Sequence, residues 1–519
     1  HMAYGTEGIY GIPTYVSSTY IFLFILFGSF LERAGMIRLF TDVALGLFGH
    51  RQGGAAKVAV VSSGLMGTIS GSGVANVVTT GQFTIPLMKK FGYRSAFAGG
   101  VEATASMGGQ IMPPVMGAVA FIMAETLDVP YVEVVKAALI PAILYFASAF
   151  WMVHLEAGKH GLKGLAKADL PSPRKAIAEN WMLLVPLGVL IYLLFGGYTP
   201  LFAGTIGLGL TVLLILGGTA VMNLPAGAMR LAFWVCLGLV AAAFFEFGIE
   251  VLVVALAALI LWCAVTNGGR ETLHLCRDSL AEGAKTALPV GVACALVGII
   301  IGTMTLTGAA NTFGQFIVSV GKTSLLLSLI LTMLTCILLG MGIPTIPNYI
   351  ITSSIAGPAL LALGVPLIVS HMFVFYFGIL ADLTPPVALA CFAAAPIAKE
   401  NGLRISFEAI KVAAAGFVIP FMAVYTPALM LQAGGPLADA IGYWPAVAYI
   451  VFKTVICIGL WGAAVIGWLG RPLGWPLRLL GVVAAGTLIA ALPLTDEIGF
   501  ALAAAFVAGV VLMGRRAAA

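Results

Sequence analysis

The sequence contains very few charged residues. Only 9% of its 519 residues are Asp, Glu, Lys or Arg, whereas 61% are hydrophobic and the mean hydropathy is +1.07. A soluble globular domain carries about 25% charged residues, so this composition excludes a soluble protein. Apolar runs of about 20 residues, the length that crosses about 30 Å of hydrocarbon, recur along the whole chain. We therefore expect an all-α polytopic membrane protein.

The sequence also lacks the motifs of several other protein classes. None of the seven cysteines forms a CxxC pair, so neither a disulfide framework nor a cysteine-based metal site is indicated. No HExxH motif occurs, and Gly321-Lys322-Thr323 lacks the upstream glycine of a phosphate-binding loop, because residue 316 is Phe. An intramembrane protease would need a second Asp or a Ser/His pair at mid-depth, and we find neither. We expect no enzymatic activity, no cofactor and no nucleic-acid partner.

The few charges that occur indicate a topology. Basic residues cluster at 33–57, 89–94 and 159–175, whereas the turn at 125–133 is acidic. Because cytoplasmic loops are enriched in Lys and Arg, these clusters lie inside and the start of the chain lies outside. Alternating loops fit nearly every apolar segment, with Lys322 as the exception. The pattern predicts a multi-pass protein of the bacterial or archaeal cytoplasmic membrane, surrounded by the lipid bilayer.

Two segments, 54–92 and 322–364, do not fit as simple spans. Each is too long for one crossing and is interrupted in the middle by small or helix-breaking residues, at 70–76 and 340–348. Irregular backbone at membrane depth is tolerated only where protein buries it or where it lines a cavity. We interpret both segments as re-entrant helical hairpins, each entering and leaving on one side of the membrane.

The two hairpins belong to an internal repeat. In one register and without a gap, Asn76 aligns with Asn348, and Pro113-Pro114 aligns with Pro385-Pro386. Each unit then reads as a span, an amphipathic connector, a hairpin, a span broken at the double proline, and a further span. A double proline removes two backbone donors, so the carbonyls before it are free.

The charge pattern predicts that the repeats are inverted. Basic residues at 89–94 place the base of the first hairpin inside, whereas the second hairpin leaves through the uncharged stretch 357–366, which we place outside. Inverted repeats with discontinuous helices are the architecture of secondary transporters, whose binding site lies near the midplane. The expected domains are a first inverted repeat at 13–155, connecting scaffold spans at 156–284, a second inverted repeat at 285–430, and C-terminal scaffold spans at 431–519.

The hairpin tips and broken spans hold the candidate binding residues. Where a helix ends, its carbonyls and amides lose their intrahelical partners. Freed carbonyls with Ser, Thr and Asn oxygens suit a hard monovalent cation, and freed amides suit a carboxylate. The predicted cation ligands are Ser70, Ser72, Asn76, Gly109, Gln110, Thr345, Asn348, Asp382 and Thr384, and the predicted substrate contacts are Gly71, Gly73, Gly108, Gly342 and Thr345.

Ionisable residues within the spans are candidates in their own right. Asp382 is the strongest, because an ionisable group at mid-membrane is costly and marks function by default. Its repeat partner, Gln110, is neutral, so the two sites differ in charge. Glu102 lies on the other broken span, where it either faces the cavity or sits near an interface. His371 and Lys453 lie near span ends, where we expect snorkelling or packing.

Two stretches carry a resemblance to a known family. Residues 67–81, GTISGSGVANVVTTG, resemble the first hairpin of the large membrane subunit of TRAP (tripartite ATP-independent periplasmic) transporters. Residues 109–117, GQIMPPVMG, resemble the branch served by TAXI-type binding proteins, in which the small and large membrane subunits are fused. The likeness covers roughly residues 13–430 and is most specific in the two hairpin regions.

The resemblance implies the other components of the transporter and the way it works. A secreted, periplasmic TAXI-type binding protein would deliver an organic acid, a sodium gradient would drive its uptake, and the repeat core would move like an elevator against a scaffold. The cation ligands would then hold sodium and no other metal. The small membrane subunit would be fused upstream or separate. Because residue 1 is His and the first span begins almost at once, we expect the chain to be a piece of something longer.

Two other functions stay open at this point. A sodium/dicarboxylate symporter of the same broad fold would work without a binding protein. An intramembrane enzyme would keep its turnover without a membrane gradient, and the missing catalytic pair argues against it. Reconstitution with and without the binding protein and the gradient separates these alternatives.

Inversion of the two hairpins can be tested by labelling. We expect a single cysteine placed in 89–94 to react with a membrane-impermeant reagent from the cytoplasmic side only, and one placed in 362–366 to react from the opposite side only. Labelling of both positions from the same side would contradict the inversion.

Overall fold

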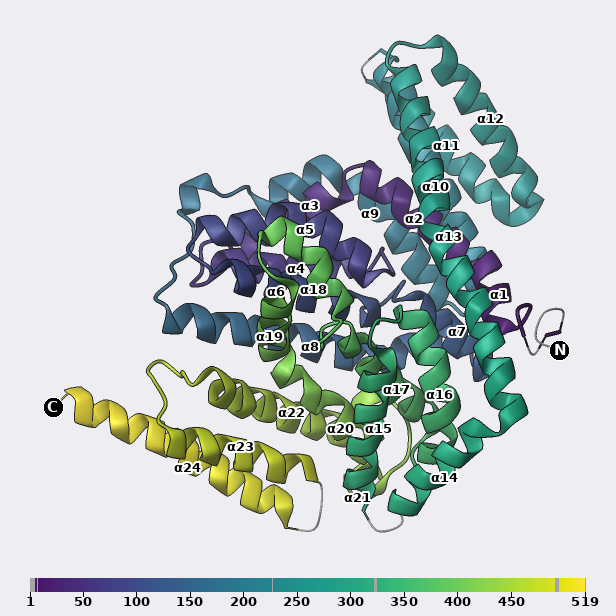
Figure 1. Ribbon diagram of the computed structural model, residues 1–519. Coiled ribbons are helices and arrows are strands. Elements are labelled where there is room, and N and C mark those ends of the chain that lie inside the picture. The colour runs from purple at the N-terminus through teal and green to yellow at the C-terminus, as the bar shows by residue number, and fades with distance from the viewer. Residues whose placement is uncertain (1–4, 7, 226, 322–323, 491–493, 519) are drawn as a thin grey trace.

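The computed structural model describes residues 5–6, 8–225, 227–321, 324–490 and 494–518 (Figure 1). Over these residues the chain is helical, and the sole β-type pairing is an isolated bridge between Trp468 and Pro472. Eight of the described helices are long and apolar enough to cross a membrane. The expected class, an all-α polytopic membrane protein, is confirmed.

The first part of the chain contains one hairpin and one broken helix. Three consecutive segments, α1 (Ile12–Val16), η1 (Ser17–Ile21) and α2 (Phe22–Arg33), form the first span, and α3 (Met36–Phe48) follows as a connector. The hairpin consists of α4 (Gly54–Gly67) and α5 (Gly73–Lys90). The broken span consists of α6 (Ser95–Gly108), η2 (Gly109–Ile111) and α7 (Ala118–Thr126), and α8 (Tyr131–Lys159) completes the unit.

A later part of the chain contains the same order of elements. The long helix α13 (Gly269–Thr307) is followed by α14 (Ala309–Gly321), and the second hairpin consists of α15 (Leu325–Gly340) and α16 (Thr345–Ala362). A broken span of α17 (Leu367–Ala381) and α18 (Leu389–Ala398) follows, and then α19 (Gly402–Ala413), η4 (Ala414–Phe417), α20 (Val418–Tyr425) and η5 (Pro427–Met430). Both breaks contain a cis peptide bond, at Pro113-Pro114 and Pro385-Pro386.

Two further groups of helices surround this core. Between the two parts lie η3 (Lys167–Asp169), α9 (Pro173–Phe195), α10 (Pro200–Met222), α11 (Ala228–Phe247) and α12 (Ile249–Val265). After them come α21 (Pro436–Ile441), α22 (Tyr443–Ile466), α23 (Trp475–Ala490) and α24 (Thr495–Ala518). In Figure 1, α11 and α12 project from the top of the bundle, and the yellow helices α23 and α24 lie along its lower left side.

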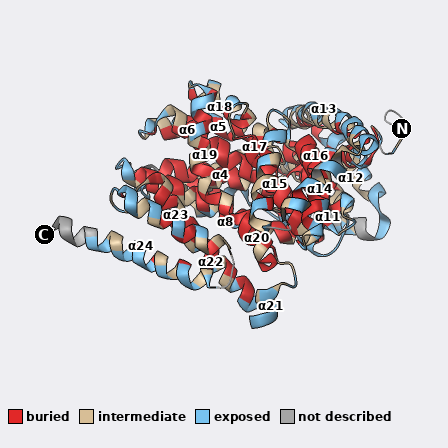
Figure 2. Ribbon diagram, turned by 60° about the horizontal axis from the view of Figure 1, so that its bottom comes forward, coloured by how far each residue is buried: buried red, intermediate tan, exposed pale blue. Residues whose placement is uncertain are grey.

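The hairpins and broken helices form the buried centre of the molecule. Figure 2 shows buried residues gathered in α4, α5, α6, α17 and α19, whereas the described part of α24 is largely exposed. The two repeats interlock there, because α18 packs against both α5 and α6, and α19 packs against α6. The outer helices expose large apolar side chains such as Tyr192, Leu239 and Val254, as expected for surfaces that face lipid.

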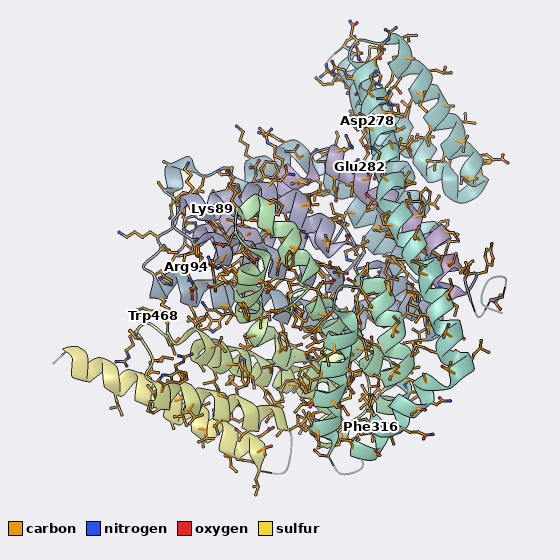
Figure 3. The ribbon with its side chains drawn as sticks, in the orientation of Figure 1. Lys89, Arg94, Asp278, Glu282, Phe316 and Trp468 are labelled. Atoms are coloured by element: carbon orange, nitrogen blue, oxygen red, sulfur yellow. The ribbon has the colours of Figure 1, made fainter. Side chains whose placement is uncertain are left out.

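Basic residues at the base of the first hairpin hold the two repeats together. The Lys89 ammonium donates to the carbonyl of Ala398 at the end of α18, over 2.7 Å. Arg94, which lies near Lys89 in Figure 3, pairs with Glu408 of α19 at 2.9 Å. The buried Glu156 of α8 accepts from Lys411 of α19 at 3.0 Å. The residues that indicated topology therefore also form contacts between the repeats.

Two details differ from the sequence-based expectations. Helix α13 runs without interruption through residues 284 and 285, where we placed a domain boundary. Lys453 takes the second of the two roles expected for it, packing rather than snorkelling, but it is not near a span end. It lies well inside α22, is buried, and donates to Asp496 of α24 over 2.6 Å. Because a buried charge requires a partner, this ion pair joins two helices whose contact was not foreseen.

The tip of the first hairpin depends on a close backbone approach. A Cβ atom added to Gly67 would lie 2.3 Å from Cα of Gly109 and 2.7 Å from its carbonyl oxygen. Any side chain at residue 67 would therefore push α4 away from the broken span.

We expect Gly67→Ala to destabilise the protein by about 1–3 kcal/mol, the usual effect of overpacking a tight contact. The measurement is the melting temperature of the purified protein. Gly188→Ala is the matched control, because a Cβ at this helical glycine meets nothing within 4 Å. An unchanged melting temperature for Gly67→Ala would show that the tip can separate from the broken span without cost.

Candidate functional site

The first hairpin tip places its predicted residues against the break of α6–α7. Helix α5 starts at the tip, and the Ser72 hydroxyl caps it by accepting from the amide of Ala75 over 3.3 Å. A Cβ on Gly73 would lie 2.7 Å from Nε2 of Gln110, so this glycine lets the tip approach the broken span. A Cβ on Gly71 would likewise meet the carbonyl of Met116 at 2.8 Å.

The buried Asn76 ties the two helices of this hairpin together. Its Nδ2 donates to the carbonyl of Ser63 on α4 over 3.0 Å, and its Oδ1 lies 3.2 Å from the Thr80 hydroxyl, for which it is one of several alternative acceptors. Gly109 packs beside it, since a Cβ there would lie 3.4 Å from Nδ2 of Asn76. Asn76 with Gly109 and Gly73 with Gln110 thus lie in contact across the hairpin and the broken span, at a tip that includes the half-buried Ser70.

The second tip has the corresponding arrangement with a carboxylate. The Thr345 hydroxyl, at the start of α16, donates to Oδ2 of Asp382 over 3.2 Å. Nδ2 of Asn348 donates to the carbonyl of Gly378 on α17 over 3.0 Å. Gly342 lies at the exposed end of the tip with a φ of 76°, a left-handed conformation that favours glycine.

Two oxygens at the second tip are buried without a hydrogen-bond partner among the described residues: Oδ1 of Asn348 and Oδ1 of Asp382. The two side chains are only 1% and 2% exposed. A buried unsatisfied acceptor costs about 1–3 kcal/mol, and more when it is charged. Among the described residues, no Lys or Arg pairs with Asp382. Amide and carboxylate oxygens of this kind are ligands that a hard cation prefers.

Not every predicted residue joins these clusters. Gly108 faces α8, because a Cβ there would lie 2.1 Å from the ring of Tyr145, so it does not point into a substrate space. The Thr384 hydroxyl donates to the carbonyl of Leu380 over 2.9 Å, which leaves only its lone pairs for a cation. In the described part of the chain, no hydrogen bond connects the residues of one tip with those of the other.

Glu102 occupies neither of the positions that we considered for it. Its carboxylate is fully buried inside the first repeat, surrounded by hydroxyl groups from α4, α5 and α6. The sequence singled out the residue type, but the ring of Ser and Thr around it comes from three helices, and only their packing reveals it.

Comparison with known proteins identifies the family. Residues 7–437 match the family model described as "Tripartite ATP-independent periplasmic transporter, DctM component". The chain belongs to this family. Membership places it among multi-pass inner-membrane transporters, and its relatives are permeases rather than enzymes.

Three relatives show how far the similarity extends. The C4-dicarboxylate TRAP transporter large permease protein DctM of Pseudomonas aeruginosa is 29% identical over 35% of this chain and 43% of the relative. The sialic acid TRAP transporter large permease protein SiaM of Vibrio cholerae is 27% identical over 38% and 46%. The isethionate TRAP transporter permease protein DctMQ of Oleidesulfovibrio alaskensis is 23% identical over 79% and 57%. The matches with the first two span less than half of those relatives.

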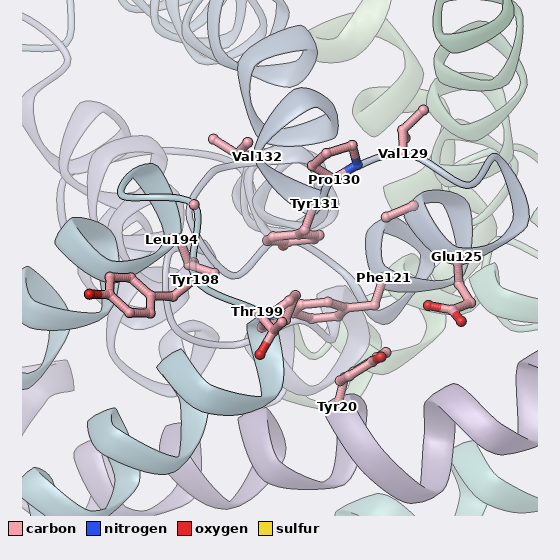
Figure 4. A pocket seen from close by; sticks show the side chains of 13 residues that line it. Tyr20, Phe121, Glu125, Val129, Pro130, Tyr131, Val132, Leu194, Tyr198 and Thr199 are labelled. Carbon is pink, nitrogen blue, oxygen red and sulfur yellow. The ribbon is translucent and has the colours of Figure 1, made fainter. Parts of the chain in front are cut away.

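In this member of the TRAP family, two cavities lie away from the hairpin tips. One, of about 190 Å³, is lined by aromatic side chains including Tyr20, Phe121 and Tyr131, with Glu125 at its edge (Figure 4). The other, of about 400 Å³, lies beside Tyr349 and His371, whose hydroxyl and Nδ1 are 2.8 Å apart. His371 is therefore a buried, hydrogen-bonded residue of the second repeat rather than a snorkelling one.

Tyr131 connects the first cavity with the broken span of the permease. Its ring stacks on Phe121 with centroids 4.3 Å apart, and its hydroxyl reaches the carbonyls of Pro114 and Val115 at 3.0 and 2.8 Å. A tyrosine on α8 thus supplies one O–H donor to the carbonyls at the non-helical break, a contact between distant segments that no sequence motif indicated.

We expect Tyr131→Phe to destabilise the protein by about 1–3 kcal/mol, because the two buried carbonyls lose the one hydroxyl donor that they share. The check is the melting temperature of the purified protein. Tyr198→Phe is the control, since this tyrosine lines the same cavity but is 46% exposed. Equal melting temperatures for both variants would mean that another donor, such as water, satisfies the break.

Proposed function

We propose that this chain is the permease of a sodium-coupled TRAP transporter that imports an organic acid delivered by a periplasmic binding protein. The observation that carries the proposal is the pair of buried, unpartnered oxygens on Asn348 and Asp382 at the second hairpin tip. Sodium suits this site, because a hard cation prefers carboxylate, amide and carbonyl oxygens.

The distribution of charge supports coupling between cation and substrate. No Lys or Arg occurs in the hairpin tips or in the broken spans between 96 and 124 and between 369 and 398. A bound carboxylate would therefore be balanced by sodium and by the N-termini of α5 and α16, each worth about 0.3–1 kcal/mol when exposed and more when partly buried. An unpaired anion at mid-membrane is strongly unfavourable, so substrate binding requires the cation.

The two hairpins supply the cation sites of the proposed cycle. We assign one sodium to Asn348, Asp382, Thr345 and Thr384, and a second, uncharged site to the first tip with Ser70, Ser72, Asn76, Gly109 and Gln110. Substrate would lie between the tips, near Gly71, Gly73, Gly342 and Thr345. Gly108 is withdrawn from this set because it packs on Tyr145.

An inverted, elevator-type arrangement fits the order of the elements. In Figure 1, the connector α3 lies toward the top of the bundle and the connector α14 at its lower edge, so the two hairpins follow connectors at opposite ends. The core of α4–α6 and α15–α18 would move as the transport unit, and α9–α12 with α22–α24 would form the scaffold.

The partners follow from the family. TRAP permeases work with a periplasmic binding protein and a small membrane subunit, and one relative carries the joined name DctMQ. We propose a TAXI-type binding protein, on the strength of the GQIMPPVMG stretch at 109–117. A binding-protein-independent sodium/dicarboxylate symporter is the alternative, and uptake into proteoliposomes without any binding protein would favour it.

Asp382→Asn tests the cation site. We expect it to raise the sodium concentration needed for half-maximal uptake by about tenfold or more, since removing one partner of a buried charged pair costs several kcal/mol. Gln110→Ala should have a smaller effect, because the first site holds no charge. The measurement is initial uptake of radiolabelled dicarboxylates into proteoliposomes, with the binding protein present, over a series of sodium concentrations.

Calorimetry on the purified permease tests whether sodium binding and substrate binding strengthen each other. Sodium should tighten substrate binding, and substrate should tighten sodium binding by the same factor. An unchanged sodium dependence in Asp382→Asn would remove Asp382 from the cation site. Substrate affinity that is indifferent to both sodium and protons would remove the coupling mechanism itself.

A further inference from the structure

Glu102 is the second carboxyl group at the centre of the molecule, and the proposed sodium cycle does not use it. It lies on α6, 0% exposed, in a cluster made only of hydroxyl groups. Oε1 accepts from Ser63 at 2.9 Å, from Ser106 at 3.0 Å and from Thr80, and Oε2 accepts from Thr84 at 2.5 Å. An ionisable group so deep in the membrane is a functional candidate by default.

No charged side chain compensates this carboxylate within the described residues. The cations on the helices packed around α6 are engaged elsewhere. Lys57 of α4 contacts His154 of α8, and Lys89 of α5 donates to the carbonyl of Ala398. Lys90 of α5 is exposed. The titratable side chains of α8, α17, α18 and α19 make their contacts with groups other than Glu102: Tyr131, Glu133, Lys136, Tyr145, Glu156, Lys159, His371, Tyr376, Cys391, Arg404, Glu408 and Lys411.

The cluster can satisfy the carboxyl group in both of its states. When Glu102 is ionised, all four hydroxyls donate to it. When it carries a proton, its own O–H donates to Thr84 Oγ1, and the Thr84 hydrogen turns to the carbonyl of Thr80, which is 3.1 Å away. The Thr80 hydroxyl has the same choice, because the carbonyl of Asn76 lies at 2.7 Å. No backbone movement is needed to exchange one state for the other.

The same geometry selects a proton over a metal ion. The oxygens around Glu102 already lie at hydrogen-bonding distances from one another, with Ser63 Oγ only 3.2 Å from Thr80 Oγ1. Here the acceptors are matched with hydroxyl donors, whereas the second tip leaves two buried acceptors unmatched. An ionised carboxylate buried without a counter-charge is very costly, so the packed cluster needs a proton to be neutral.

We propose that the Glu102 carboxyl is a proton-binding site of the transport cycle, separate from the two sodium sites. The proposal rests on the proposed transport function for its role, although not for the binding itself. On loading, a carboxylate oxygen forms an O–H bond with a proton from hydronium, and water leaves. On release, when the first hairpin moves and water enters, the proton returns to water.

The two repeats therefore place their buried carboxyl groups at different positions. The position aligned with Glu102 in the second half is Val374, and the position aligned with Asp382 in the first half is Gln110. Among the described residues, each repeat has a deeply buried carboxyl group without a cationic partner, at a different place: Glu102 is matched by hydroxyl donors, and Asp382 has an open oxygen. Proton and sodium thus act at separate positions in this chain.

Infrared difference spectroscopy on the purified full chain tests the site directly, with the proton alone as the ligand. Spectra are compared between about pH 5 and about pH 9, the range in which a buried glutamate titrates. We expect a carbonyl-stretch band of a protonated carboxyl group that disappears in Glu102→Gln and persists in Asp382→Asn and in the surface control Glu125→Gln. A band that survives in Glu102→Gln, or no band in the wild type, would overturn the proposal.

A second variant keeps the test informative if Glu102→Gln folds poorly. Thr84→Val preserves the shape of the side chain but removes the donor to Oε2. We expect it to shift the pH midpoint of the band toward higher pH, because the hydrogen bond that the ionised form loses is charge-assisted and stronger than the neutral one that the protonated form loses. An unchanged midpoint would overturn the assignment to the Glu102 cluster.

Uptake measurements test the role in transport. In proteoliposomes with equal sodium on both sides, the binding protein and succinate, an inward proton gradient should stimulate uptake by the wild type. Glu102→Gln should lose this stimulation while keeping its response to a sodium gradient. Equal stimulation in both would overturn the role of Glu102. If no gradient of either ion drives uptake, the proposed function fails, and the infrared band still decides whether Glu102 binds a proton.

Discussion

The structure depends on one constraint: backbone polar groups inside the bilayer must find partners within the protein. An unbroken helix is the simplest way to meet this constraint. Two helical hairpins and two broken spans depart from it at matching places in the two parts of the chain. The first hairpin and its broken span contact helices of the other repeat. Tyr131, on α8, donates at the first break. Only a few buried oxygens at the tips lack a hydrogen-bond partner among the described residues, and we assign these oxygens to ions.

The placement of the carboxyl groups follows from the same constraint. A buried charge persists only with a partner, and the described part of the chain provides partners of three kinds. Lys453 and Asp496 pair directly, Glu156 is bound by Lys411, and Glu102 is surrounded by hydroxyls. At Asp382, by contrast, one oxygen accepts from Thr345 and the other has no partner. This difference separates Asp382, which we assign to a cation, from the carboxyl groups whose oxygens have partners within the protein.

Much of the fold could be read from the sequence because membrane insertion leaves strong one-dimensional signals. Low charge and apolar runs gave the all-α class, which the structure confirms. Breaks at small residues and prolines marked the hairpin tips, and α4–α5 and α15–α16 are helical pairs at those places. The alignment of Asn76 with Asn348 located the two tips, although the inversion of the repeats stays a prediction. Contacts between distant helices, such as α18 with α5, left no comparable signal.

The sequence alone determined the membrane class, the positions of the tips and the residue types at the candidate sites, because period, length and charge act locally along the chain. Only the tertiary structure decided which of those residues meet. It turned Gly108 toward Tyr145, matched Asn348 with the carbonyl of Gly378, and enclosed Glu102 in hydroxyls from three helices. These outcomes depend on helix packing across long stretches of chain, where a rotation of one helix moves a side chain from a binding site into a packing contact.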